Sequence, residues 1–217
     1  MVFVDKKERN LTFSKFVWIF VIGSIAGYVF ETSFYYIKHG VFMNKQGLLY
    51  GPIKPIYGFG CAILTYILNF VRDKSKLYIF IFGSIVGGIF EYACSLILEY
   101  FYGTRMWTYA NMGLDIHGRV YLPYLPVWGL IALLWLKVVY PKFNNLYNKI
   151  PKKPLLIATI LMSIFLIYDS GISTLATRRM TERAHNIPAG NKFEKYLDKH
   201  YPDEYILKKV PYLKIVD

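Results

Sequence analysis

Two apolar segments of the chain each place a carboxylate after a pair of glycines. Residues 23–31 read Gly-Ser-Ile-Ala-Gly-Tyr-Val-Phe-Glu and residues 83–91 read Gly-Ser-Ile-Val-Gly-Gly-Ile-Phe-Glu, so that six of nine positions are identical. Residues four apart share a helix face, which puts the glycines and the glutamate on one stripe. Such stripes let helices approach closely in lipid, where an unpaired acid is costly. We therefore predict a functional polar centre built on Glu31 and Glu91.

The composition indicates that the helices carrying these acids lie in a membrane. The chain has 217 residues, 55% of them hydrophobic, and its apolar runs reach the length of about 20 residues that crosses the hydrocarbon core. The net charge of +12 could suggest nucleic acid, but the basic residues gather at the ends of apolar runs, as membrane anchors do. We expect the lipid bilayer as a partner and no nucleic acid. The two cysteines favour neither a disulfide framework nor a metal site, and we expect no cofactor.

We predict an all-α polytopic membrane helix bundle with about five spans, at residues 15–37, 56–71, 77–101, 122–141 and 154–176. A cytoplasmic N-terminal segment (1–14) precedes the membrane domain (15–176), and a charged C-terminal tail (177–217) follows it. Twelve basic residues flank the spans on the side of the N-terminus, against five in the opposite loops. The excess of lysine and arginine on the cytoplasmic side of membrane proteins places the N-terminus there, in a multi-pass protein of the cell membrane.

A second pair of segments extends the internal similarity. Residues 47–58 and 118–129 share two glycines, a tyrosine and two prolines at matching positions. The first pair of segments is offset by 60 residues and the second by 71, so the later loop carries about eleven extra residues, around 102–114. We predict two parallel two-helix repeats, 15–71 and 77–141, and a closing helix at 154–176.

The candidate site follows from depth along the spans. Glu31, Glu91 and Asp169 lie about two-thirds of the way along spans that run in the same direction, which gives them similar depth. Segments broken by proline and glycine at corresponding places in two repeats indicate a transporter binding site. The substrate-binding candidates are therefore Glu31, Glu91, Arg119, Asp169, Asn44, Tyr50, Tyr121 and His117, with no metal site.

Structural roles compete with this interpretation. Glu31 and Glu91 could simply pair with Arg119 and Arg105 and fix helix packing. Asp169 could serve only as a hydrogen-bonding residue between helices. Signatures of classical enzymes are missing, including the phosphate-binding loop of ATPases, so any ATP hydrolysis would need a separate ATPase subunit.

The segment Leu49-Tyr50-Gly51-Pro52, followed by Pro55-Ile56-Tyr57-Gly58, resembles the bacterial ABC-transporter permease family of CmpB-like membrane proteins. Glu91, Trp107-Thr108-Tyr109, Gly118-Arg119-Val120 and Trp128-Gly129 fit the same family pattern. The resemblance covers roughly residues 15–175. It implies a permease of a bacterial inner membrane, working with a separate ATPase.

Together these observations predict a permease-like transport protein that binds or translocates a small substrate through the centre at Glu31 and Glu91, and that could form a homo-oligomer. Two alternatives remain open. One is a membrane-embedded enzyme acting on lipid or cell-envelope substrates, and the other is a non-catalytic scaffold or sensor whose tail binds a partner. Enzyme activity is less expected than its absence.

Overall fold

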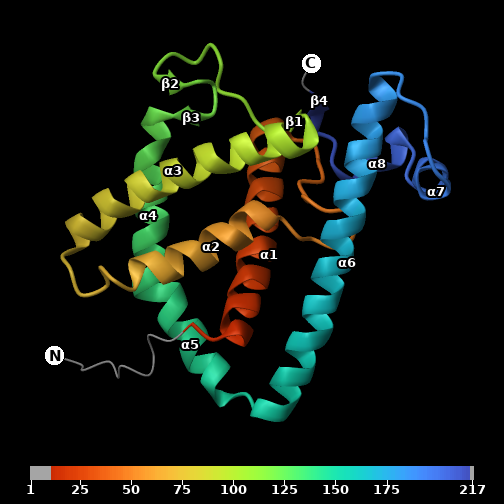
Figure 1. The fold of residues 1–217 in the computed structure, drawn as a ribbon. Helices are drawn as coiled ribbons and strands as arrows, with labels where there is room; N and C mark the ends of the chain where they lie inside the picture. The colour runs from red at the N-terminus through yellow and green to blue at the C-terminus, as the bar shows by residue number, and fades with distance from the viewer. Residues whose placement is uncertain (1–10, 216–217) are drawn as a thin grey trace.

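The computed structural model describes residues 11–215, and the chain is 71% helical. Its long elements are α1 (Phe13–His39), α2 (Pro55–Leu68), α3 (Lys76–Tyr102) and α6 (Lys152–Ala184). Between α3 and α6, the 3-10 turn η2 (Leu122–Tyr124), α4 (Leu125–Leu134), the π-helical turn η3 (Trp135–Val139) and α5 (Tyr140–Lys149) form one continuous rod. Two short helices follow α6, namely α7 (Lys192–His200) and α8 (Asp203–Lys209) (Figure 1).

The first and third helices begin and end in the same way. The side chain of Thr12 accepts a hydrogen bond from the backbone of Lys15 at the start of α1, and Ser75 caps α3 through Tyr78. Each helix ends at a glycine in the left-handed conformation, which a residue without Cβ adopts at little cost. Local sequence therefore fixes the bounds of both glutamate-bearing helices.

Strands are short and pair only across loops. The strand β1 (Thr104–Arg105), directly after α3, pairs antiparallel with β4 (Lys214–Ile215) near the end of the chain. The strand β2 (Asp115–Ile116) pairs antiparallel with β3 (Val120–Tyr121) to form a small hairpin before α4. The first pairing attaches the C-terminal residues to the loop that follows α3.

Within residues 11–215, four helical segments are long and apolar enough to cross a membrane, namely Phe13–His39, Lys76–Phe101, Leu122–Lys149 and Lys152–Ala184. This confirms the prediction of a multi-pass helical membrane protein. The expected second span is the shorter α2, whose 14 residues measure about 21 Å at 1.5 Å per residue. That is less than the roughly 30 Å of hydrocarbon, so α2 alone is too short to cross it.

Each glycine-bearing helix packs closely on the short helix that follows it. A Cβ atom added at Gly27 of α1 would lie 2.2 Å from Cγ of Tyr57 on α2. A Cβ added at Gly87 of α3 would lie 2.5 Å from Cβ of Trp128 on α4. Both glycines are therefore required by the distance between the helices, as expected for small residues at helix contacts in lipid.

The residues after α6 form a compact C-terminal segment, which we define as residues 192–215 and which contains α7, α8 and β4. Leu197, Ile206 and Val210 of this segment are buried in one apolar cluster with Met180 of α6 and Leu49 of the loop after α1. In Figure 1 this segment lies at the end of α6 that also holds the loops after α1 and α3. The α5–α6 turn and the start of α1 lie at the opposite end.

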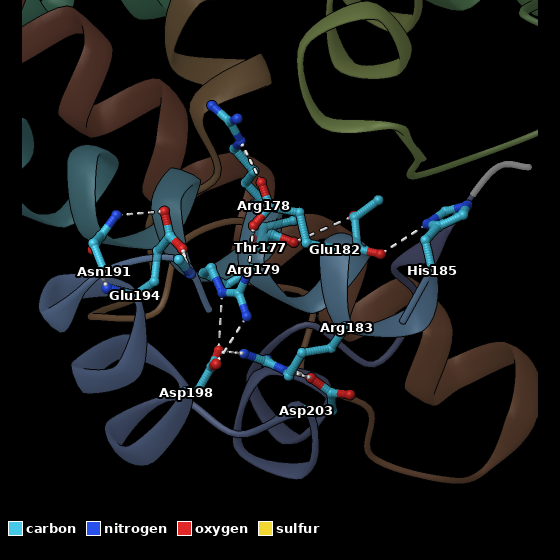
Figure 2. A network of polar contacts seen from close by, with 12 residues as sticks. Thr177, Arg178, Arg179, Glu182, Arg183, His185, Asn191, Glu194, Asp198 and Asp203 are labelled. Atoms are coloured by element: carbon cyan, nitrogen blue, oxygen red, sulfur yellow. Dashed lines mark hydrogen bonds and ion pairs between the residues drawn. The ribbon is translucent and has the colours of Figure 1, made fainter. Parts of the chain in front are cut away.

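Ion pairs hold α7 and α8 against the end of α6 (Figure 2). The guanidinium of Arg179 donates to both carboxylate oxygens of Asp198, at 3.0 and 2.8 Å. Arg183, one turn later, contacts Asp198 and also Asp203 at the start of α8. Bidentate contacts of this kind fix the relative orientation of the two side chains and also pair their charges. The expected closing helix at 154–176 thus continues to Ala184, where these arginines bind the C-terminal segment.

We expect Gly27→Ala to lower the free energy of unfolding by about 1–3 kcal/mol, because Tyr57 and α2 must move to admit the methyl group. Gly171→Ala on α6 is the matched control, since a Cβ there meets nothing within 4 Å. Thermal unfolding in detergent measures both variants. Equal unfolding temperatures for the two variants would contradict the close packing of α1 on α2.

The C-terminal segment should loosen in acid. Hydrogen bonds from Arg179 hold the pKa of Asp198 below its usual value of about 3.9. The stabilisation is therefore fully present above about pH 4 and is lost as the pH falls through the lowered pKa of the folded state. Hydrogen–deuterium exchange of residues 192–213, corrected for intrinsic rates, should show protection at pH 7 that decreases toward pH 3. Asp198→Asn should be less protected already at pH 7 and should change less with pH.

Candidate functional site

The two predicted glutamates, Glu31 and Glu91, line one cavity of about 130 Å³. We call it the polar cavity. Its walls come from α1, the start of α2, α3, the loop after α3, and α4. The lining residues are Glu31, Lys54, Ile56, Tyr57, Glu91, Met106, Trp107, Tyr109 and Trp128. Two carboxylates, one ammonium and four aromatic rings therefore face a small space between the membrane helices.

Glu31 is paired with a cation. The ammonium of Lys54, on the residue that precedes α2, forms an ion pair with one carboxylate oxygen, and the hydroxyl of Tyr57 donates to the other at 2.8 Å. The Lys54 side chain is only 6% exposed. Glu31 thus supplies the counter-charge of a buried lysine at the start of α2.

Glu91 is held by neutral donors. The hydroxyl of Tyr109 donates to one carboxylate oxygen at 2.9 Å, and the indole N–H of Trp128 donates to the other at 3.0 Å. Glu91 is 7% exposed, and within residues 11–215 no lysine or arginine forms an ion pair with it. Both oxygens are hydrogen-bonded, but the charge itself has no counter-ion among the described residues.

Tyr57 and Trp128 each combine a packing contact with a hydrogen bond to a carboxylate. The ring of Tyr57 packs on Gly27 and its hydroxyl binds Glu31, four residues further along α1. Trp128 packs on Gly87 and binds Glu91 in the same relation. The two side chains occupy matching positions in the similar segments 47–58 and 118–129. The close helix contact therefore also orients both carboxylates.

The proposed pairing of the two glutamates with Arg119 and Arg105 is wrong. Both guanidiniums contact Glu99 instead, Arg119 at 3.0 Å, and Arg119 also donates to Ser95 at 3.0 Å. The reason lies in the helix period, because Ser95 and Glu99 continue the stripe of Glu91 by one and two further turns of α3. The arginines bind the later carboxylate near the end of α3, and Arg119 does not line the polar cavity.

Asp169 lies outside the polar cavity and anchors the loop after α1. Fully buried on α6, it accepts hydrogen bonds from the backbone N–H of Tyr50 at 3.1 Å and from the hydroxyl of Ser173 at 3.0 Å. The hydroxyl of Tyr50 in turn contacts that of Tyr201 in the C-terminal segment at 2.8 Å. Asn44 exchanges hydrogen bonds with Gln46 in the same loop. The structure thus gives Asp169, Tyr50 and Asn44 contacts that shape this loop.

The last two candidates lie in the loop after α3. His117 has a positive φ of 54°, as the turn between β2 and β3 requires, and its ring contacts the hydroxyl of Tyr92 at 2.8 Å. Tyr121 stacks on Tyr109, with ring centroids 6.0 Å apart. Tyr121 therefore supports a ring that donates to Glu91, whereas His117 lies at the exposed tip of the hairpin.

Seven lining residues were not among the predicted substrate-binding residues: Lys54, Ile56, Tyr57, Met106, Trp107, Tyr109 and Trp128. A signal existed for two of them. Tyr57 and Trp128 are aromatic residues with a polar donor at matching positions of the two similar segments. The signal for Trp107 and Tyr109 is weaker, since it consists only of their place in the extra residues of the later loop. Aromatic residues at the ends of spans are ordinarily membrane anchors, so the sequence did not distinguish these four rings as site residues.

Chemically, the polar cavity suits a cation. Aromatic faces attract ammonium groups through their quadrupole, and a buried carboxylate without a counter-ion attracts them by charge. Each oxygen of Glu91 accepts one hydrogen bond from a neutral donor, which orients the carboxylate without neutralising it.

A family model described as Putative ABC-transporter type IV (ABC_trans_CmpB) matches residues 18–174. No curated protein and no solved structure matches the chain. The matched region extends from α1 into α6 and contains all the residues that line the polar cavity. By this match, the chain belongs to the ABC_trans_CmpB family of ABC-transporter-type membrane proteins.

Proposed function

We propose that the protein is a permease-type transport subunit that binds a small cationic substrate in the polar cavity. The observation that carries this proposal concerns Glu91, a buried acid in a membrane helix. Among residues 11–215, its oxygens accept hydrogen bonds only from Tyr109 and Trp128. An acid inside a membrane is energetically costly and is functional by default. In this proposal the substrate supplies the positive charge that pairs with Glu91.

The rest of the polar cavity supports a cation rather than an anion. Its lining holds two glutamates and one lysine, and Lys54 is already paired with Glu31. The rings of Trp107 and Trp128 add an attraction for ammonium groups of about 0.5–2 kcal/mol each, depending on desolvation. An anionic substrate would meet the uncompensated charge of Glu91.

The arrangement of the helices supports five spans in two units. α2 runs antiparallel to α1, since Tyr57 contacts Gly27 and Cys61 contacts Gly23. The loop before α2 brings Lys54 to the depth of Glu31, so the short helix starts inside the membrane. Non-helical backbone at that depth is tolerated where it faces protein or a water-filled cavity. The similar contacts of Gly87 with Trp128 favour a second unit of the same design.

In this proposal the C-terminal segment lies on the non-cytoplasmic side. The hydroxyl of Tyr212 donates to the backbone of Lys45 at 3.2 Å, which joins this segment to the loop after α1. With a cytoplasmic N-terminus, as the charge distribution favours, that loop is outside. Energy would come from a separate ATPase on the cytoplasmic side, where α5 and the start of α6 carry lysines.

We expect Glu91→Gln to weaken binding of ethanolamine at least tenfold (about 1.4 kcal/mol) at neutral pH, where the amine is protonated. The amide keeps the size of the side chain and removes its charge. Trp107 and Trp128 line the polar cavity, so their fluorescence in the purified protein reports binding. Glu204→Gln on α8 removes the same charge from an exposed position and should bind ethanolamine as the wild type does. Equal affinity of Glu91→Gln and the wild type would refute the cation site.

A fusion experiment tests the topology. Alkaline phosphatase fused after residue 217 should be active in cells, and green fluorescent protein at the same position should stay dark, because the first folds outside the cytoplasm and the second within it. The opposite pair of results would place the C-terminus inside and would rule out five spans with a cytoplasmic N-terminus.

A further inference from the structure

A second, larger cavity of about 490 Å³ adjoins the polar cavity. We call it the apolar groove. Its walls come from α2, α3, α6 and the loops around them. The lining residues are Gly47, Leu48, Lys54, Pro55, Ile56, Phe59, Ile63, Phe90, Cys94, Ile97, Leu98, Met106, Ser170, Ser173, Thr174 and Thr177. Its volume falls in the range of roughly 300–1,000 Å³ typical of pockets that hold drug-sized molecules.

The two cavities share three residues, Lys54, Ile56 and Met106. The two cavities are therefore neighbours that share these side chains as a common wall. Lys54 is the important member of this set, because among residues 11–215 it is the only lysine that lines either cavity, and it lies at their junction. The lining is thus mainly apolar in the groove, carries one ammonium at the junction, and holds carboxylates and aromatic rings in the polar cavity.

Two apolar side chains of the apolar groove lie at the surface of the chain. Phe59 on α2 and Ile97 on α3, which line it, are 46% and 52% exposed in the isolated chain. Both belong to helices with apolar outer surfaces. A hydrocarbon chain could therefore move into the groove from the membrane without passing through water.

We propose that the polar cavity and the apolar groove together bind one zwitterionic membrane lipid with an ammonium-bearing headgroup. The ammonium lies against Glu91 and the rings of Trp107 and Trp128, and an acyl chain occupies the groove. The phosphate accepts a hydrogen bond from Lys54, whose ammonium has three donors and also pairs with Glu31. This inference rests on the cation site proposed above and names its substrate class. The order of the three chemistries along the site is the order of ammonium, phosphate and hydrocarbon in such a lipid.

Charge complementarity selects the headgroup. An anionic lipid could place its phosphate at Lys54, but it would bring no cation to Glu91, whose charge has no counter-ion among residues 11–215. A small soluble ammonium ion would neutralise Glu91 and leave the apolar groove unused. A zwitterionic lipid brings a cation to Glu91, an acceptor to the remaining donors of Lys54 and a hydrocarbon chain to the apolar walls.

The test compares two single-chain lipids of equal chain length. Native mass spectrometry of the full chain in a maltoside detergent gives the affinity for lysophosphatidylethanolamine, which is zwitterionic, and for lysophosphatidylglycerol, which is anionic. We expect one bound molecule and at least tenfold tighter binding of the zwitterion. Ser170→Phe fills the groove and should weaken that binding about tenfold, whereas Ile167→Phe, on the same helix but outside the groove and 74% exposed, should not change it.

Circular dichroism and size-exclusion chromatography check that each variant is folded. Cys94→Phe, which fills the groove from α3, is the second variant if Ser170→Phe fails to fold. Equal affinity for both lipids, or full binding by a folded groove-filled variant, would overturn the proposal and leave only lipids of the surrounding shell. The proposed function fails separately, since it requires ethanolamine binding that depends on Glu91. Glu91-dependent ethanolamine binding without a lipid preference would keep the cation site and reject its lipid substrate.

Discussion

The close contact between a glycine and an aromatic ring controls the geometry of the site. Gly27 and Gly87 leave room for Tyr57 and Trp128 to lie against the neighbouring helix, with added Cβ atoms falling only 2.2 and 2.5 Å from these rings. The polar atom of each ring then reaches a carboxylate one helical turn away, at 2.8 and 3.0 Å. A larger residue at either glycine would move the donor away from the acid. Helix packing and the orientation of the carboxylates are therefore one constraint.

The two halves of the polar cavity differ in charge although their packing is alike. Lys54 precedes α2 and pairs with Glu31, whereas the residue at the matching position, the first of α4, is Leu125. The longer loop after α3 supplies Tyr109 to Glu91 in place of a cation. One acid is thus neutralised within the protein and the other is not. This difference is the basis of the cation site proposed above.

The C-terminal segment lies beyond the matched family region, but it is linked to the loops around the site. Tyr212 donates to the backbone beside Lys45, and its ring lies 4.8 Å from the ammonium of Lys54. The arginines at the end of α6 hold α7 and α8 in place (Figure 2). The pairing of β4 with β1 attaches the same segment to the loop that carries Trp107 and Tyr109. It thus braces both loops that line the polar cavity.

The sequence by itself determined the membrane class, the long helices and the two acids, because these depend on local properties: apolar run length, helix capping and the four-residue period of a helix face. The internal similarity also gives Tyr57 and Trp128 matching positions in the two similar segments. Only the tertiary structure decided the partners of the charges, since pairing depends on where loops return in space. Arg119 pairs with Glu99 rather than Glu91, and Lys54 pairs with Glu31. Asp169 accepts a hydrogen bond from the backbone of Tyr50. The apolar groove likewise arises from three helices that no single stretch of sequence brings together.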